Sequence, residues 1–399
     1  SVDSYKMPGA LTGMWWDQSG IGGNSGSWSL VPSVLMHWWM SQLMFAKFFP
    51  VICIFIAGLG AWTFFRCLKF SPLASLLGAL AAMLNSTVFT NACWGVAPQE
   101  ISLGFGFFAM ALVVVNTSET PALTRWLRLA LAGCCVGINV TESADIGALF
   151  SLLVAAFVFY KALTEENRGF FKKATAGLLR VAVVAGFAGF ISFQSVSGLI
   201  STQIQNIAGT AQDKETKAAH WDFATQWSMP KKETLGLVVP GLFGYRMDTP
   251  KDMMPQFQDC YRGGNYWGGV GRDPNIDRYF DQGGETSPGG LMRFIGAGSY
   301  CGIVVVLVAI WAAAQSFRRQ NSPYTNTQKK WIWFWLAVLV LSLPVSWGRF
   351  APLSHTSDSP LFYALLYKLP YFSTIRNPIK FLYFFSWALV VLFAYGIQA

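Results

Sequence analysis

The chain has 399 residues, of which 53% are hydrophobic, 16% aromatic and only 12% charged. Charged residues make up roughly a quarter of an ordinary soluble domain, so this composition excludes a soluble protein and indicates an integral membrane protein. The net charge of +9 could suggest nucleic-acid binding. However, the basic residues are divided among short connections on alternate sides of apolar segments, so we expect membrane lipid and no nucleic acid among the partners.

The first 47 residues predict a loop followed by a helix at the membrane surface. Residues 1 to 28 are rich in Gly, Ser and Trp and predict an irregular loop, whereas residues 29 to 46 are apolar and include Trp38 and Trp39. Tryptophan prefers the membrane interface, so the second stretch predicts an interfacial helix that ends before Pro50. The alternative is one long tilted helix that continues into the first span.

Nine apolar runs follow, each long enough to cross a bilayer core about 30 Å thick. Backbone groups in lipid must pair internally, so these runs must be helical. They predict an all-α polytopic protein with six spans in residues 48 to 200, an extracytoplasmic loop region from 201 to 293, and three spans within 294 to 399. A short apolar block at 361 to 369 predicts a second interfacial helix. The nine runs are 48–66, 72–91, 100–116, 126–141, 145–163, 177–199, 294–316, 330–347 and 378–397.

Basic residues cluster after the odd-numbered spans, within residues 66–69, 125–128, 161–173 and 318–330. Lys and Arg mark the cytoplasmic side, so we expect the N-terminus outside and the C-terminus inside, in a bacterial inner membrane. No signal peptide precedes the outside N-terminus, and the chain ends directly after a span. We therefore expect a sequence truncated at both ends.

The region from 201 to 293 carries eleven acidic and ten basic residues, so it is no charged tail. Several familiar site types have no matching pattern. The only histidines are His37, His220 and His355, all outside the predicted spans, so we expect no haem or chlorophyll ligands from His. No zinc-binding His or Cys motif and no nucleotide-binding loop is present. Cys93 and Cys260 could form a disulfide outside the membrane.

Outward-facing charged residues are the remaining candidates for chemistry. Burying a carboxylate near lipid is costly, which favours a task for those kept there. Glu142 and Asp145 lie in the turn between the fourth and fifth spans, where the alternative is a solvated turn with Asp145 capping the next helix. Arg349 and Arg376 flank the last outer connection. They could hold a phosphate bidentately, or they could be ordinary Arg residues at helix ends.

Two blocks carry a resemblance to a known family. The first is Ala224-Thr-Gln-Trp-Ser228 with Glu233-Thr-Leu, Pro240, Gly244 and Tyr266-Trp-Gly268, and the second is Leu369-Pro-Tyr-Phe-Ser-Thr-Ile-Arg-Asn-Pro378 before a Phe-rich span. These blocks resemble YfhO-type bacterial membrane proteins, which are similar to the GT-C glycosyltransferases. The resemblance covers most of the chain, although the helices match by pattern alone. Such enzymes move a sugar from a polyprenyl-phosphate carrier to an acceptor on the outer side of the membrane.

The resemblance implies an acidic residue in the first outer loop as base or metal ligand, which here is Asp17 or, second, Asp3. It implies that Arg376, with Arg349 as a second cation, holds the lipid phosphate, and that a divalent cation could take part. Glu142, Asp145 and Glu233 are additional candidate acids. The loop aromatics suit either sugar stacking or interfacial anchoring; they are Trp15, Trp16, Trp227, Tyr266 and Trp267.

The sequence departs from the family in lacking a helix before the first loop and a clear pair of acidic residues. These departures leave a second hypothesis open, in which the chain is a non-catalytic subunit that docks membrane-protein partners. A transporter is a third and weaker alternative, because the predicted spans contain almost no buried charge pairs.

Overall fold

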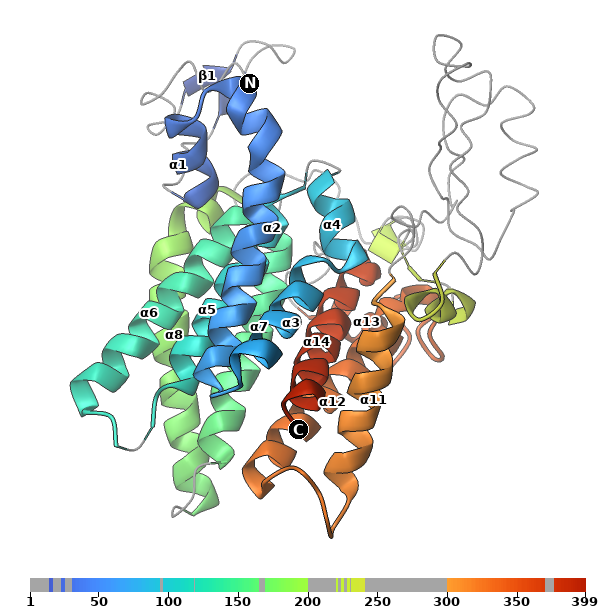
Figure 1. Ribbon diagram of the computed structural model, residues 1–399. Coiled ribbons are helices and arrows are strands. Elements are labelled where there is room, and N and C mark those ends of the chain that lie inside the picture. The colour runs from blue at the N-terminus through green and yellow to red at the C-terminus, as the bar shows by residue number, and fades with distance from the viewer. Residues whose placement is uncertain are drawn as a thin grey trace, which may run out of the picture. The chain divides into compact units, whose positions relative to one another are not determined.

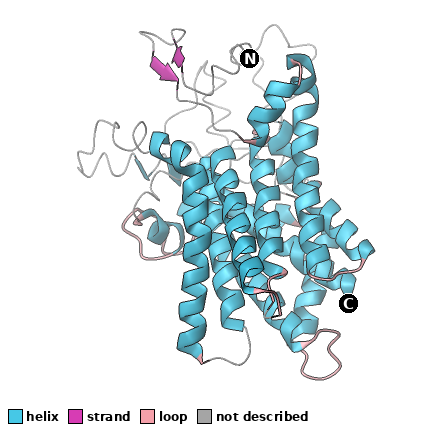
Figure 2. Cartoon of the chain, turned by 90° about the vertical axis from the view of Figure 1, so that its left-hand side faces the viewer, coloured by secondary structure: helices cyan, strands magenta, loops and turns pink. Residues whose placement is uncertain are grey.

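A computed structural model describes residues 14–16, 23–25, 31–93, 96–117, 119–164, 169–199, 220–221, 224–225, 228–229, 231–240, 300–369 and 377–399. Within these ranges the chain is helical, apart from loops and one pair of short strands (Figures 1 and 2). Strands β1 (Met14–Trp16) and β2 (Gly23–Ser25) pair antiparallel. They stand in a stretch predicted to be irregular, and the bulky residues of β1 favour the extended backbone.

Six helical segments of the described chain are long and apolar enough to cross a membrane. This confirms a multi-pass helical membrane protein. The six segments are α2 (Gln42–Cys67), α6 (Ala122–Glu142), α7 (Ala144–Thr164), α8 (Phe170–Leu199), α12 (Asn326–Ser346), and the 3-10 helix η9 (Pro378–Phe381) with α14 (Leu382–Gln398).

The other three predicted spans coincide with shorter or broken helices. Helices α3 (Pro72–Met83) and α4 (Ser86–Cys93) together pass the same length test but are bent by 52°. Helices α5 (Pro98–Val114) and α11 (Ile303–Phe317) have 17 and 15 residues. Helix α11 begins later than predicted because Gly302 before it has a φ of 91°, which is not helical. The count of nine spans therefore stays a prediction.

The predicted break before the first span lies elsewhere in the structure. Helix α1 (Pro32–Trp39) ends before Ser41, and α2 then runs without interruption through Pro50. Ser41 begins α2 because its hydroxyl accepts the Met44 N–H at 3.4 Å, which satisfies one of the free donors of the first turn. The expectation that Pro50 separates two helices was wrong. Helix α13 (Phe362–Tyr367) lies within the second predicted interfacial segment.

The chain forms two compact units, which we call unit 1 (Ser1–Leu84 and Asn91–Ile207) and unit 2 (Asn85–Thr90 and Ala208–Ala399). In unit 1, helices α2 and α5 pack closely where Gly60 faces Gly104. A Cβ atom added to Gly104 would lie 2.7 Å from the Ile56 carbonyl oxygen, so only glycine permits this approach. Phe64 and Phe107 are fully buried beside this contact, with ring centroids 5.7 Å apart.

In unit 2, helix α14 forms the core. It packs against both α11 and α12 (Figure 1), and every residue from Leu382 to Tyr395 except Phe384 is buried. The Tyr324 hydroxyl, in the connection before α12, donates a hydrogen bond to the Tyr395 carbonyl at 3.2 Å. This contact ties the connection between α11 and α12 to the end of α14.

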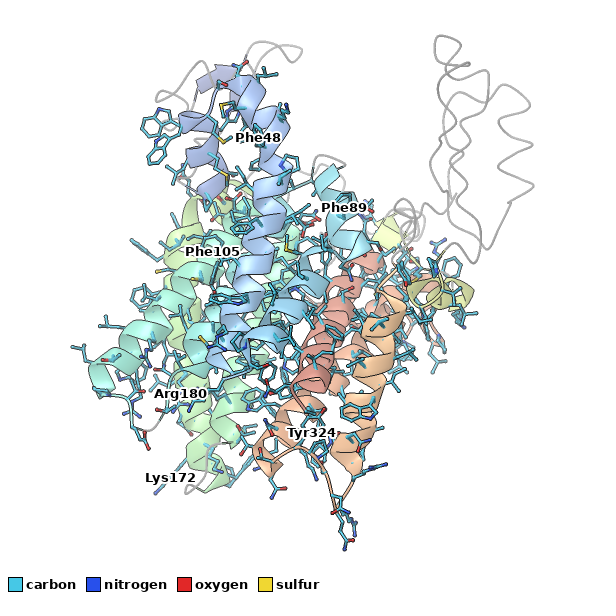
Figure 3. All side chains as sticks on the ribbon, viewed as in Figure 1. Phe48, Phe89, Phe105, Lys172, Arg180 and Tyr324 are labelled. Atoms are coloured by element: carbon cyan, nitrogen blue, oxygen red, sulfur yellow. The ribbon has the colours of Figure 1, made fainter. Side chains whose placement is uncertain are left out.

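Charge is unevenly distributed along the helices of unit 1. Among its described Lys and Arg residues, all except Lys47 lie near the end of α2 or α7 or near the start of α6 or α8. Figure 3 shows Lys172 and Arg180 toward the end of α8 that is far from α1. The carboxylates of Glu100, Glu142 and Asp145 lie at the opposite helix ends. Glu119, in the connection between α5 and α6, is a described carboxylate at the basic end, and the orientation of the chain in the membrane stays a prediction.

Candidate functional site

Most predicted site residues fall where no side chain is described. Trp15 and Trp16 are placed only as backbone of β1, and Glu233 only as backbone of the 3-10 helix η4 (Lys231–Leu237). Seven further residues of the predictions lie outside the described residues, namely Asp3, Asp17, Trp227, Cys260, Tyr266, Trp267 and Arg376. The structure therefore places side chains for Glu142, Asp145 and Arg349.

Glu142 lines a pocket of unit 1 with a volume of about 360 Å³. The pocket is formed by α1 together with the first turns of α2 and α5 and the last turns of α6 and α8. All four of these helix ends lie away from the basic end of the unit. By the predicted topology, the pocket opens on the outer side of the membrane.

One oxygen of the Glu142 carboxylate is engaged and the other is not. The backbone N–H of Ser33 donates to Oε1 at 2.8 Å. Ser33 is the second residue of α1, where N–H groups have no partner within the helix, so the carboxylate satisfies one of them. Oε2 is buried and has no hydrogen-bond partner among the described residues. This oxygen therefore lacks the hydrogen bond that a buried carboxylate oxygen usually has.

Aromatic rings form one wall of the same pocket. The His37 ring stacks on Phe45 with centroids 4.3 Å apart, and Phe45 stacks on Phe49 at 4.4 Å. His37 belongs to α1 and both phenylalanines to α2, so the stack also holds these two helices together. A flat apolar face opposite a carboxylate is an arrangement that suits a ring with hydroxyl groups, such as a sugar.

Asp145 has a structural role. Its Oδ1 accepts the backbone N–H of Ile146 at 2.7 Å and the Ser143 hydroxyl at 3.4 Å. Helices α6 and α7 are joined by Ser143 alone, so Asp145 satisfies free donors at the start of α7. Asp145 thus matches the alternative interpretation, a residue that caps the next helix, although α7 begins at Ala144. Glu142, by contrast, faces the pocket.

Two buried polar residues that were not predicted lie just below this pocket. Glu100 and Asn139 are each 0% exposed, and neither the carboxylate oxygens of Glu100 nor the amide atoms of Asn139 have a hydrogen-bond partner among the described residues. Glu100 follows Pro98 of the pocket wall by two residues. Asn139 precedes Glu142 by three residues on α6, which puts both on one helix face. The hydroxyl of Ser102 on α5 donates to the Asn139 carbonyl at 2.9 Å, so the two helices are in contact here.

Glu100 could have been found from the sequence, because a carboxylate inside an apolar run is a candidate functional residue. It was overlooked because the third predicted span starts at residue 100, which made it look like a boundary residue. Buried polar groups are nearly always hydrogen-bonded, so these two exceptions, on the pocket-lining helices α5 and α6, are informative. We therefore include Glu100 and Asn139 in the candidate site.

Arg349 lies in unit 2, in the 3-10 helix η7 (Gly348–Phe350). Its Nε donates to the Thr225 hydroxyl at 3.1 Å, and its backbone N–H donates to the Ser228 hydroxyl at 3.3 Å. The N–H of Asn377 also donates to a carbonyl of this segment, that of Ala224, at 2.9 Å. Arg349 and the residue that follows Arg376 in the sequence are thus fixed to the same short segment.

No group of three His, Cys, Asp or Glu residues in the described part of the chain is placed to hold a metal ion. Comparison with protein-family models, with curated proteins and with solved structures finds no match. The resemblance to YfhO-type proteins therefore depends on the two sequence blocks alone.

Proposed function

We propose that this protein is a membrane glycosyltransferase that moves a sugar from a polyprenyl-phosphate donor to a cell-envelope acceptor on the outer side of the membrane. The observation that carries the proposal is the Glu142 carboxylate. It lines a pocket of about 360 Å³, and one of its oxygens has no hydrogen-bond partner among the described residues, at the helix ends opposite the basic end of unit 1. The stacked rings of His37, Phe45 and Phe49 add a surface for a sugar ring.

Glu142 takes the role of general base in this reaction. Its carboxylate accepts the proton of an acceptor hydroxyl as the hydroxyl oxygen bonds to the anomeric carbon, while the bond from the anomeric carbon to the phosphate oxygen breaks. The leaving lipid phosphate gains negative charge, which an Arg guanidinium can stabilise. Arg349 and Arg376 stay proposed lipid-phosphate-binding residues within unit 2, and Asp17 and Asp3 stay proposed acids of the first outer loop.

The test compares Glu142→Gln with Asp145→Asn, which removes a nearby carboxylate whose role is to cap α7. Purified wild-type protein and both variants would be given a mixture of radiolabelled polyprenyl-phosphate hexoses and pentoses. Release of water-soluble sugar would be counted, with water as the acceptor. Loss of a general base typically slows a reaction by about 10²–10⁴-fold, so Glu142→Gln should fall by that amount and Asp145→Asn should stay near wild type. Wild-type release by a folded Glu142→Gln protein would refute the role of Glu142.

A non-catalytic subunit is the second candidate, and one observation favours it. Trp39 at the end of α1 and Leu43 at the start of α2 are 84% and 78% exposed, close to the pocket. Large exposed apolar side chains can mark a surface that another protein covers. Purification from native membranes in a mild detergent distinguishes between the two proposed functions. A stoichiometric partner, together with no sugar release by the wild type, would favour the subunit.

A further inference from the structure

Helix α8 is longer than the membrane requires. It has 30 residues, which at 1.5 Å per residue is about 45 Å, against a hydrocarbon core of about 30 Å. Residues 181 to 199 contain no charged side chain, and this stretch alone has a length of about 28 Å. The first turns of α8, from Phe170 to Arg180, therefore extend beyond the hydrocarbon core into the headgroup region at the basic end of unit 1.

Three other basic side chains at this end donate hydrogen bonds within the protein. Arg66 donates to the Phe70 carbonyl, Arg128 to the Val115 carbonyl at 2.7 Å, and Lys161 to the Val114 carbonyl at 3.0 Å. Val114 and Val115 lie at the end of α5, where carbonyl groups lack partners within the helix. Arg128 and Lys161 therefore satisfy these carbonyl groups and contribute to folding.

Lys172 and Lys173 differ from these residues. Neither side chain donates a hydrogen bond to any residue in the described part of the chain, and Lys172 is exposed. Phe170 and Phe171, directly before them, are 67% and 84% exposed. A pair of aromatic rings beside two ammonium groups that donate no hydrogen bond within the described residues matches a lipid headgroup region, in which apolar chains meet phosphates.

The net charge around Lys172 and Lys173 remains positive when the connection before α8 is included. Residues 165 to 180 contain two acidic residues, Glu165 and Glu166, and four basic ones, Arg168, Lys172, Lys173 and Arg180, so the net charge is 4 − 2 = +2. Zwitterionic lipids gain little from such a surface, whereas lipids with a net negative headgroup are attracted to it.

We propose that the first turns of α8, from Phe170 to Arg180, bind the headgroups of anionic phospholipids in the membrane leaflet at the basic end of unit 1. The phenylalanine rings insert among the acyl chains, and Lys172 and Lys173 pair with the phosphates. The occupant is a lipid, because a free phosphate would give the exposed rings nothing to contact. This binding surface does not depend on the proposed sugar transfer.

The experiment counts lipids bound to the purified protein by native mass spectrometry. The wild type would be titrated with phosphatidylglycerol and with phosphatidylcholine of the same chain length, and with soluble glycerol phosphate as a free-phosphate probe. The double variant Lys172→Gln/Lys173→Gln should bind phosphatidylglycerol about 30-fold more weakly, which corresponds to about 1 kcal/mol for each lysine. Wild-type affinity for the same lipid should also fall as salt is raised.

The control is the charge-preserving variant Lys172→Arg/Lys173→Arg, which should bind phosphatidylglycerol as the wild type does. The proposal would be overturned by equal binding of the two lipids, by an unchanged affinity of the Lys172→Gln/Lys173→Gln variant, or by tight binding of glycerol phosphate. If that variant fails to fold, a salt-independent affinity of the wild type would also overturn it.

Discussion

Replacing Glu100 by methionine should make the protein more stable. Glu100 is fully buried on α5, and neither carboxylate oxygen has a partner among the described residues. A buried polar group without a hydrogen bond costs about 1–3 kcal/mol, and an ionised group costs more. Methionine has a similar unbranched shape and no polar oxygen. We expect Glu100→Met to raise the free energy of unfolding by about 1–4 kcal/mol, the range for replacing a buried ion pair by apolar side chains.

The assay is unfolding by sodium dodecyl sulfate in mixed micelles, followed by tryptophan fluorescence. Glu100→Gln serves as the matched variant, because it keeps a polar group and should gain far less stability than Glu100→Met. Sugar release should decrease in the stabilised variant, since a residue kept at a cost to stability is usually kept for function. A Glu100→Met protein less stable than the wild type would refute the reasoning, because it would mean that the carboxyl group has a stabilising partner.

Two further predictions concern packing and pH. Gly104→Ala should lower the free energy of unfolding by about 1–3 kcal/mol, because the new Cβ would overlap the Ile56 carbonyl. The control is Gly186→Ala, where no atom lies within 4 Å of the added Cβ. The same assay should show no loss of stability for this control. Burial raises the pKa of Tyr324 from 10.0 to about 12, so the folded state keeps this proton when the unfolded state loses it. Stability from this group is present below pH 10 and decreases as the pH rises toward 12. Unfolding measured across this range should depend less on pH in Tyr324→Phe, and an identical pH dependence in both proteins would contradict the assignment.

The helices were largely predictable because apolar length determines what can cross a bilayer. Six of the predicted spans coincide with helices that pass this length test. The errors arose from local capping. Hydropathy contains no information on helix capping. It therefore could not predict that α2 begins after Ser41 or that α11 begins only after Gly302. Pro50 was overvalued as a helix breaker, since a proline removes one backbone hydrogen bond and the remaining bonds of α2 keep the helix intact.

The candidate site was less predictable, because it depends on contacts between distant segments. Glu142 and Asp145 are three residues apart, and both were candidate acids, with Asp145 also a possible cap of the next helix. Only the hydrogen bond from Ser33, 109 residues earlier, distinguishes the pocket residue from the capping residue. Glu100 carried a usable signal in being a carboxylate at the start of an apolar run, whereas nothing in the sequence marks Asn139 as fully buried.

The central position of α14 has a consequence for synthesis. Helices α11 and α12 both pack against α14, yet α14 follows them in the chain. During translation these two helices enter the membrane before their common partner exists, and small residues such as Ala312, which lies beside Gly396 of α14, must meanwhile contact lipid or another protein. Unit 2 therefore reaches its final packing only after its last helix has been made. Lesions in α14 would accordingly affect the assembly of helices synthesised long before it.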